Sequence, residues 1–349
     1  FKGNPNIGSV VLNQFSQSDE FRDFASQMKD GDRIFIISSI FGGTGASGFP
    51  LLLKKLRSID SKMAGSAAVR DSVIGAVTVM PYFDIEQSET SEINSATFIS
   101  KTKAALAYYD RNVHEANALY YIGDRSLGTP YKNSEGGSTQ LNAAHIVELA
   151  SALAIVDFAA MSDLKTERGC PKDPVYKEFG IKDEIDGKRS DLESVIFANM
   201  DGMTNIRIKK PLTMFTLFCK YLSEQMSSSY SNQAWAIDHG IDANFLKSSF
   251  YVNELTDIKN HYMKWLQELS ENKRAFAPFE LRERKNDLFS LIKGEKPAKV
   301  MSLKSNYALF DDYLNSSGKD FKRDGGKESI FLELFYTAIE KLSKDKFRL

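Results

Sequence analysis

The chain has 349 residues, of which 42% are hydrophobic, enough to form one large domain or two smaller ones. Its 45 Lys and Arg residues nearly balance 46 Asp and Glu residues, so a nucleic acid is not an expected partner without a local basic patch. Cys170 and Cys219 lack disulfide or metal-ligand spacing. Because neither a membrane-length apolar run nor a signal peptide is present, we expect a cytoplasmic protein without a membrane partner.

The first half of the chain alternates between strand and helix patterns. Short apolar runs predict buried strands at residues 34–37, 73–79 and 118–122. Helical patterns occur at residues 20–28, from Pro50 onward, and at residues 93–109. Right-handed crossovers through these helices would make the strands parallel neighbours in a doubly wound sheet.

The rest of the chain predicts helices. Apolar residues occupy nearly every face of residues 141–161, which predicts a buried central helix. The fold class is therefore α/β, with a mostly parallel doubly wound sheet, this buried central helix and a largely helical C-terminal region. Three parts are expected: a nucleotide-binding type of domain at 1–164, a connecting excursion rich in charge, proline and glycine at 165–210, and a mainly helical region at 211–349.

The most informative segment is the glycine-rich stretch from Gly42 to Gly48, between a predicted strand and a predicted helix. Free amide groups and the helix dipole favour a phosphate at such a helix start, and glycines let the backbone approach it. Tight packing of the turn is the structural alternative. The segment also satisfies the dinucleotide pattern GxGxxG, which indicates a nicotinamide enzyme. Against that interpretation, a helical segment precedes the strand, and no tyrosine has a lysine four residues later.

A second interpretation extends beyond the glycines. The GGxGxG stretch after the strand resembles the signature loop of the tubulin and FtsZ family. Residues 3–8 resemble the family's terminal-phosphate loop, residues 77–83 its strand ending in V-T-x-P-F, and residues 121–125 its I-P-N-D-R loop, with Gly123 where a base-binding Asn is expected. Residues 142–145 then open the central helix. This resemblance covers about residues 3–161.

The resemblance implies a guanine nucleotide, GTP or GDP with Mg²⁺, as ligand. The residues that it places at the nucleotide are Gly3, Asn4, Gly42, Gly43, Thr44, Gly45, Ala46, Ser47, Asp84, Glu86, Asn142 and His145. Among them, the hydroxyls of Thr44 and Ser47 would contact phosphate or magnesium, or only cap the helix. Asp84 and Glu86 would bind ribose, or be solvated acids. Asn142 and His145 lie on one helix face and would reach the base, although a lone His is more often structural.

The sequence also departs from the family. Its first glycine-rich loop has no counterpart here, so we expect roughly 80 to 110 further N-terminal residues in a full-length protein. Asp201 is the candidate acid for GTP hydrolysis in a neighbouring subunit, but no second acid stands three residues after it. The helical final third differs from the family's sheet-containing C-terminal domain. A self-assembling GTPase and a non-catalytic scaffold or interaction protein both remain open.

Overall fold

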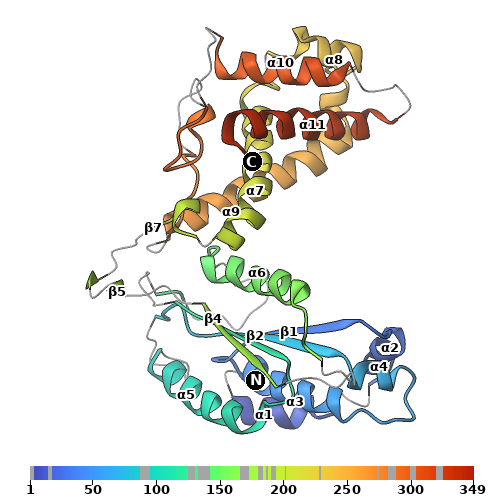
Figure 1. Ribbon diagram of the computed structural model, residues 1–349, viewed down its shortest axis with the longest axis vertical. Coiled ribbons are helices and arrows are strands. Elements are labelled where there is room, and N and C mark those ends of the chain that lie inside the picture. The colour runs from blue at the N-terminus through green and yellow to red at the C-terminus, as the bar shows by residue number, and fades with distance from the viewer. Residues whose placement is uncertain are drawn as a thin grey trace. The chain divides into compact units, whose positions relative to one another are not determined.

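The computed structural model (Figure 1) divides the chain into two compact units, Phe1–Asp191 and Leu192–Leu349, which are considered separately. The structure describes residues 4–14, 18–86, 95–124, 130–132, 142–165, 173–179, 184–185, 188–189, 194–200, 202–227, 229–272, 275–281, 288–298, 304–319 and 325–349. Within these ranges no helix is both long and apolar enough to cross a membrane.

The N-terminal unit is built on a parallel sheet with the order β1-β2-β3-β4. Its strands are β1 (Arg33–Ser39), β2 (Val73–Val79), β3 (Ala118–Ile122) and β4 (Val175–Phe179). The three predicted strands are confirmed as parallel neighbours. The prediction that residues 34–37 are buried on both faces is wrong, because β1 lies at a sheet edge and Ile37 is 58% exposed. The fourth falls in the stretch expected to be a connection, where Lys177 and Glu178 interrupt its apolar pattern. Such charges are tolerated because β4 lies at a sheet edge. A short antiparallel pair, β5 (Glu184–Ile185) and β6 (Lys188–Arg189), follows.

Helices cover both faces of this sheet, as the doubly wound fold requires (Figure 1). One face, which includes Ile34 and Ile36 of β1, packs against α2 (Asp19–Gln27), α3 (Gly43–Arg57), α4 (Ser66–Arg70) and α5 (Ser95–Asn112). A further helix, α1 (Pro5–Leu12), lies along α3. The opposite face packs against α6 (Ile146–Ala160), whose Phe158 meets Phe35 of β1.

Two helices differ from the sequence expectation. Helix α6 was predicted to be buried all round, but Ile155 is 38% exposed and Val156 is 47% exposed, because α6 buries only the face toward the sheet. Helix α3 begins at Gly43, so Pro50 lies inside it instead of opening it. Its first two turns therefore contain most of the glycine-rich segment, which was predicted to be a loop.

The C-terminal unit is mainly helical, as expected. Its helices are α7 (Gly202–Glu224), α8 (Ala234–Asp238), α9 (Thr256–Glu271), α10 (Asn306–Gly318) and α11 (Lys327–Phe347), with a π-helical segment at Phe250–Leu255 before α9 and a parallel pair of β7 (Ser194–Val195) and β8 (Ala275–Phe276). Buried aromatic rings form its core: Tyr221, Trp235, Phe310, Phe331 and Phe335. Helix α7 starts well before the predicted boundary at Pro211, which lies inside the helix.

Candidate functional site

The carboxyl ends of β1, β2 and β3 share one edge of the sheet, and two helices begin there. Helix α3 follows β1 after a short turn. His145, which precedes α6, lies 3.8 Å (Nε2 to Oδ2) from Asp124, two residues beyond the end of β3. The helices cover opposite faces of the sheet, and this is the kind of edge at which doubly wound folds bind ligands.

The start of α3 has no side-chain cap. Gly42 occupies the N-cap position and makes no side-chain hydrogen bond, whereas Asn4, Ser18 and His145 each cap their helix with a side-chain acceptor. The amide hydrogens of the first turn of α3 therefore have no side-chain acceptor among the described residues. They can donate to an anion, which the helix dipole also favours.

The glycines of this segment have different roles. A Cβ atom on Gly45 would lie 2.3 Å from the backbone oxygen of Ser39, so Gly45 lets α3 pack closely against the end of β1. A Cβ atom on Gly42 would meet only the Ser39 hydroxyl, at 3.3 Å. Gly43 and Ala46 are buried within the first turns of α3. Tight packing of the turn therefore explains the glycine at position 45. Gly42 is less crowded and lines the neighbouring cavity.

The two predicted hydroxyl groups also differ. The Ser47 hydroxyl donates to the Gly43 carbonyl at 2.7 Å and is buried, so it is engaged inside the helix. Thr44 is exposed on the first turn of α3. Of this pair, Thr44 is free to turn its hydroxyl toward a bound phosphate.

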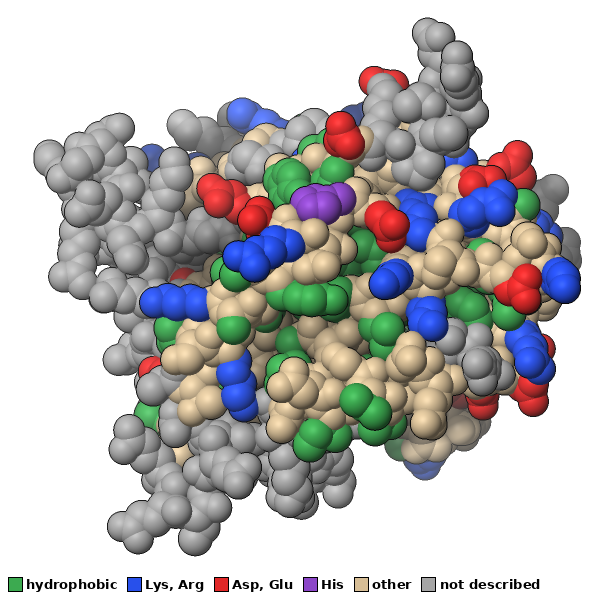
Figure 2. Space-filling view, turned by 90° about the horizontal axis from the view of Figure 1, so that it is seen from below, with side chains coloured by type: hydrophobic (Ala, Val, Ile, Leu, Met, Phe, Trp, Pro, Cys, Tyr) green, Lys and Arg blue, Asp and Glu red, His purple; other side chains and the backbone are tan. Residues whose placement is uncertain are grey.

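A cavity of about 480 Å³ runs along α3 from Gly42 to Lys54, between α1 and α5. Gly42, Lys54, Lys101 and Tyr108 are among its lining residues, together with the first turn of α1. Asn4 caps α1 through hydrogen bonds of 3.1 and 3.4 Å to backbone amides, so residues 5–8 are helical and not a loop. Gly3 lies outside the described residues. Figure 2 shows this side of the unit, with lysine and arginine side chains spread among apolar ones.

A group of aromatic rings joins the two helix starts. The Phe41 ring lies 6.4 Å from the Tyr82 ring, which lies 4.8 Å from the His145 ring (centroid distances). Phe83, Phe98 and Tyr131 extend the group. Burial raises the pKa of Tyr82 to about 12, so its hydroxyl stays neutral at physiological pH. The sequence patterns did not single out these rings, although the Tyr82-Phe83 pair lies in one of the resembling motifs.

His145 has a structural role. Its Nδ1 accepts a hydrogen bond of 3.1 Å from the Val147 amide and thereby caps α6. The neutral ring then carries its proton on Nε2, which faces the Asp124 carboxylate, a side chain only 2% exposed. His145 can therefore offer its ring face to a base, but its nitrogens are directed toward protein groups. Asn142 is exposed and, like His145, precedes the first residue of α6, so the two residues do not share a helix face as the sequence predicted.

The remaining residues predicted at the nucleotide, Asp84 and Glu86, and the predicted catalytic Asp201 come after α3 in the sequence. Asp84 and Glu86 flank Ile85, which forms a parallel bridge with Tyr131, and Glu86 is exposed. Asp201 lies outside the described residues. Within the described part of the chain, His, Cys, Asp and Glu side chains do not gather in threes as metal ligands would.

Comparisons with protein-family models, curated proteins and solved structures find no match to this chain. The geometry of the edge is therefore the basis for assigning a function.

Proposed function

We propose that the N-terminal unit binds a guanine nucleotide at the carboxyl edge of its parallel sheet. The observation that carries this proposal is the uncapped start of α3, which follows the parallel strand β1 after a short turn and is headed by Gly42. The phosphate groups would accept hydrogen bonds from the amides of Gly43, Thr44 and Gly45. The resemblance of the surrounding motifs to the tubulin and FtsZ family is the reason for choosing guanine.

The charge of the neighbouring helices supports an anionic ligand. Lys101 and Lys103 lie in the first half of α5, whereas the basic residues of α3 (Lys54, Lys55 and Arg57) and Arg111 of α5 lie in the last turns of their helices, away from Gly42. The whole chain has a formal net charge of −1. Lys101 and Gly42 line the same cavity, so Lys101 would attract a phosphate bound there, whereas Thr44 lines a separate cavity.

The chemistry of the site fits a phosphate better than a complete magnesium site. Thr44 is the exposed hydroxyl at the start of α3, and the Ser47 hydroxyl is already engaged with Gly43. A magnesium ion would be held mainly by phosphate oxygens, with the hydroxyls of Thr44 and Ser39 beside the start of α3, and would neutralise phosphate charge. A non-catalytic scaffold that keeps this fold is the second candidate, because no second acid stands three residues after Asp201 in the sequence.

Calorimetric titration of the whole chain with GTP, GDP, ATP and NADH tests the proposal. We expect GTP and GDP to bind, with an affinity that falls as salt rises. ATP binding as tight as GTP binding would contradict the choice of guanine. NADH binding without GTP binding would support the nicotinamide enzyme, and binding of none of the four would support the scaffold.

A further inference from the structure

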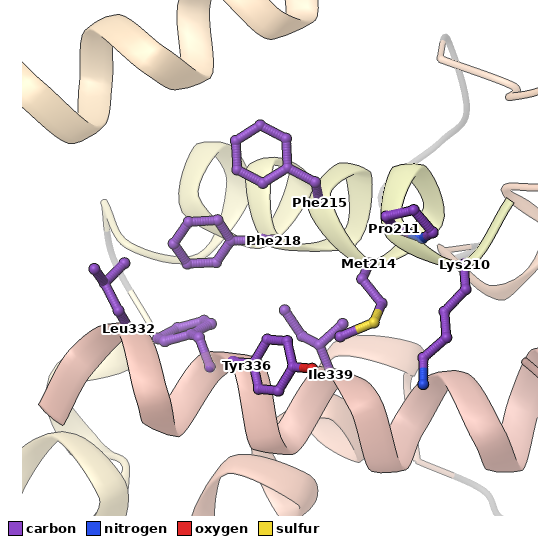
Figure 3. Close-up of a pocket in the computed structure, with 9 residues that line it drawn as sticks. Lys210, Pro211, Met214, Phe215, Phe218, Leu332, Tyr336 and Ile339 are labelled. Carbon is purple, nitrogen blue, oxygen red and sulfur yellow. The ribbon is translucent and has the colours of Figure 1, made fainter. Parts of the chain in front are cut away.

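The C-terminal unit contains an apolar groove between α7 and α11, with a volume of about 520 Å³ (Figure 3). One wall is formed by Pro211, Met214, Phe215 and Phe218 of α7, and the other by Leu332, Phe335, Tyr336 and Ile339 of α11. In both helices these residues follow the i, i+3, i+4, i+7 spacing of a single helix face. The volume lies within the roughly 300–1,000 Å³ typical of small-molecule sites.

The groove is open to solvent. Tyr336 is 60% exposed and Leu332 is 42% exposed, although both point toward the apolar wall of α7. Phe218 and Phe335, by contrast, are buried against each other with ring centroids 5.2 Å apart. The groove therefore has a firmly packed aromatic floor and an accessible mouth.

One end of the groove is polar. Lys210, the charged residue among its lining side chains, donates from Nζ to Glu340 Oε1 at 2.9 Å. This hydrogen bond raises the pKa of Lys210, so the ammonium group stays charged. Figure 3 shows the phenol oxygen of Tyr336 on the side of its ring nearer to Lys210. An ammonium group has three hydrogens, so Lys210 can serve Glu340 and still donate to a ligand.

We propose that this groove binds an amphipathic carboxylic acid, with its apolar body against Phe215, Phe218 and Phe335 and its carboxylate at Lys210. The charge of Lys210 at one end of an otherwise apolar groove selects an anion with an apolar tail. The Tyr336 hydroxyl is the second donor to the carboxylate. The Glu340 carboxylate competes with the ligand for Lys210 and weakens its binding.

Titration of the whole chain with decanoate, below its micellar concentration, and with decan-1-ol tests this site. Lys210→Met should weaken decanoate binding about fivefold or more, since a charge-assisted hydrogen bond is lost, and should leave decanol binding unchanged. Glu340→Gln should tighten decanoate binding about twofold to threefold, because the competing carboxylate is gone. Tyr336→Phe should weaken it by a smaller factor than Lys210→Met.

Lys264→Met is the matched control, since Lys264 forms an exposed pair with Glu268 on α9, away from the groove lining. It should not change decanoate binding. Thermal unfolding of each variant shows whether the C-terminal unit remains folded. The proposal is overturned if decanoate does not bind the folded wild-type chain, or if Lys210→Met binds decanoate as tightly as the wild-type chain does. A dimer in sedimentation that Leu332→Asp dissolves would show instead that a second copy covers the groove.

Discussion

The hydroxyl of Tyr109 in α5 donates a hydrogen bond of 3.2 Å to the carbonyl of Ala46 in α3. Pro50, four residues after Ala46, has no amide hydrogen, so this carbonyl has no donor at its usual helical position. Tyr109 is buried and supplies that donor from the neighbouring helix. The contact allows α3 to continue through Pro50 and ties α5 to α3 beside the candidate site.

Replacing Tyr109 with Phe should therefore destabilise the N-terminal unit by about 1 to 3 kcal/mol, because a buried carbonyl loses its donor. In a Pro50→Ala background the same replacement should cost less, since residue 50 then donates to Ala46. Hydrogen exchange of α3 and α5 amides measures both effects in a double-mutant cycle. Tyr108→Phe is the control, because Tyr108 is 52% exposed. Equal costs in the two backgrounds would show that Tyr109 acts only through packing.

Gly45 and Gly42 should respond differently to substitution by alanine. Gly45→Ala places a Cβ atom 2.3 Å from Ser39 O, so we expect the N-terminal unit to lose about 1 to 3 kcal/mol or more. Gly42→Ala meets only a side chain that can rotate and should change stability little. Exchange rates of the β1 and α3 amides distinguish the two variants. A Gly45→Ala unit as stable as wild type would mean that α3 can shift away from β1.

A capping carboxylate at position 42 should compete with the proposed ligand. In Gly42→Asp the side chain can accept hydrogen bonds from the first-turn amides of α3, which should stabilise the helix by a few tenths of a kcal/mol to about 1 kcal/mol. The same carboxylate would occupy the phosphate position, so GTP binding should be abolished in calorimetry. Gly42→Ala, which adds neither cap nor charge, should retain binding. Undiminished GTP binding by Gly42→Asp would place the phosphate elsewhere.

Cys219 in α7 should be unreactive while the C-terminal unit is folded. Burial raises the pKa of its thiol to about 12, whereas the thiol in an unfolded chain has a pKa of about 8.5. Because the folded pKa is the higher one, this contribution to stability is fully present below pH ~8.5 and is lost as pH rises toward about 12. Dithionitrobenzoate at pH 8, applied to a Cys170→Ser variant, should react only as urea unfolds the unit. Rapid reaction without urea would show that α7 opens locally.

Asp311 should make the C-terminal unit less stable as pH rises from acid. Burial raises the pKa of its carboxyl, and the hydrogen bond from Tyr221 opposes this effect. Since the folded pKa exceeds the unfolded value, the stabilising contribution is complete below about pH 4 and is lost as pH rises through the folded pKa. Asp311→Asn should therefore be more stable than wild type at neutral pH and equal to it near pH 3.

Fluorescence measures this difference for one unit, because the chain's two tryptophans, Trp235 and Trp265, both lie in the C-terminal unit. Asp312→Asn is the control, since its carboxylate is about half exposed and pairs with Lys304. If Asp311→Asn is less stable than wild type at neutral pH, the prediction is wrong, and hydrogen bonds to the charged carboxylate outweigh the cost of its burial.

The sequence by itself determined the parallel core and the helical character of the C-terminal unit. A run such as Val73 to Val79, buried almost throughout, predicts a strand covered by helices on both faces, and the glycines after Ile34 to Ile37 mark a close strand-to-helix turn. These are local patterns, and each is visible within a few residues.

Only the tertiary structure decided which glycine between β1 and α3 packs against the end of β1 and which one is left uncrowded. Gly45 is defined by its distance to Ser39, and Ser47 by its hydrogen bond to Gly43. The aromatic group at the sheet edge, the donor that Tyr109 supplies to Ala46 and the groove between α7 and α11 all join segments distant in the sequence. Such contacts depend on how layers pack in space, so no periodicity along the chain records them.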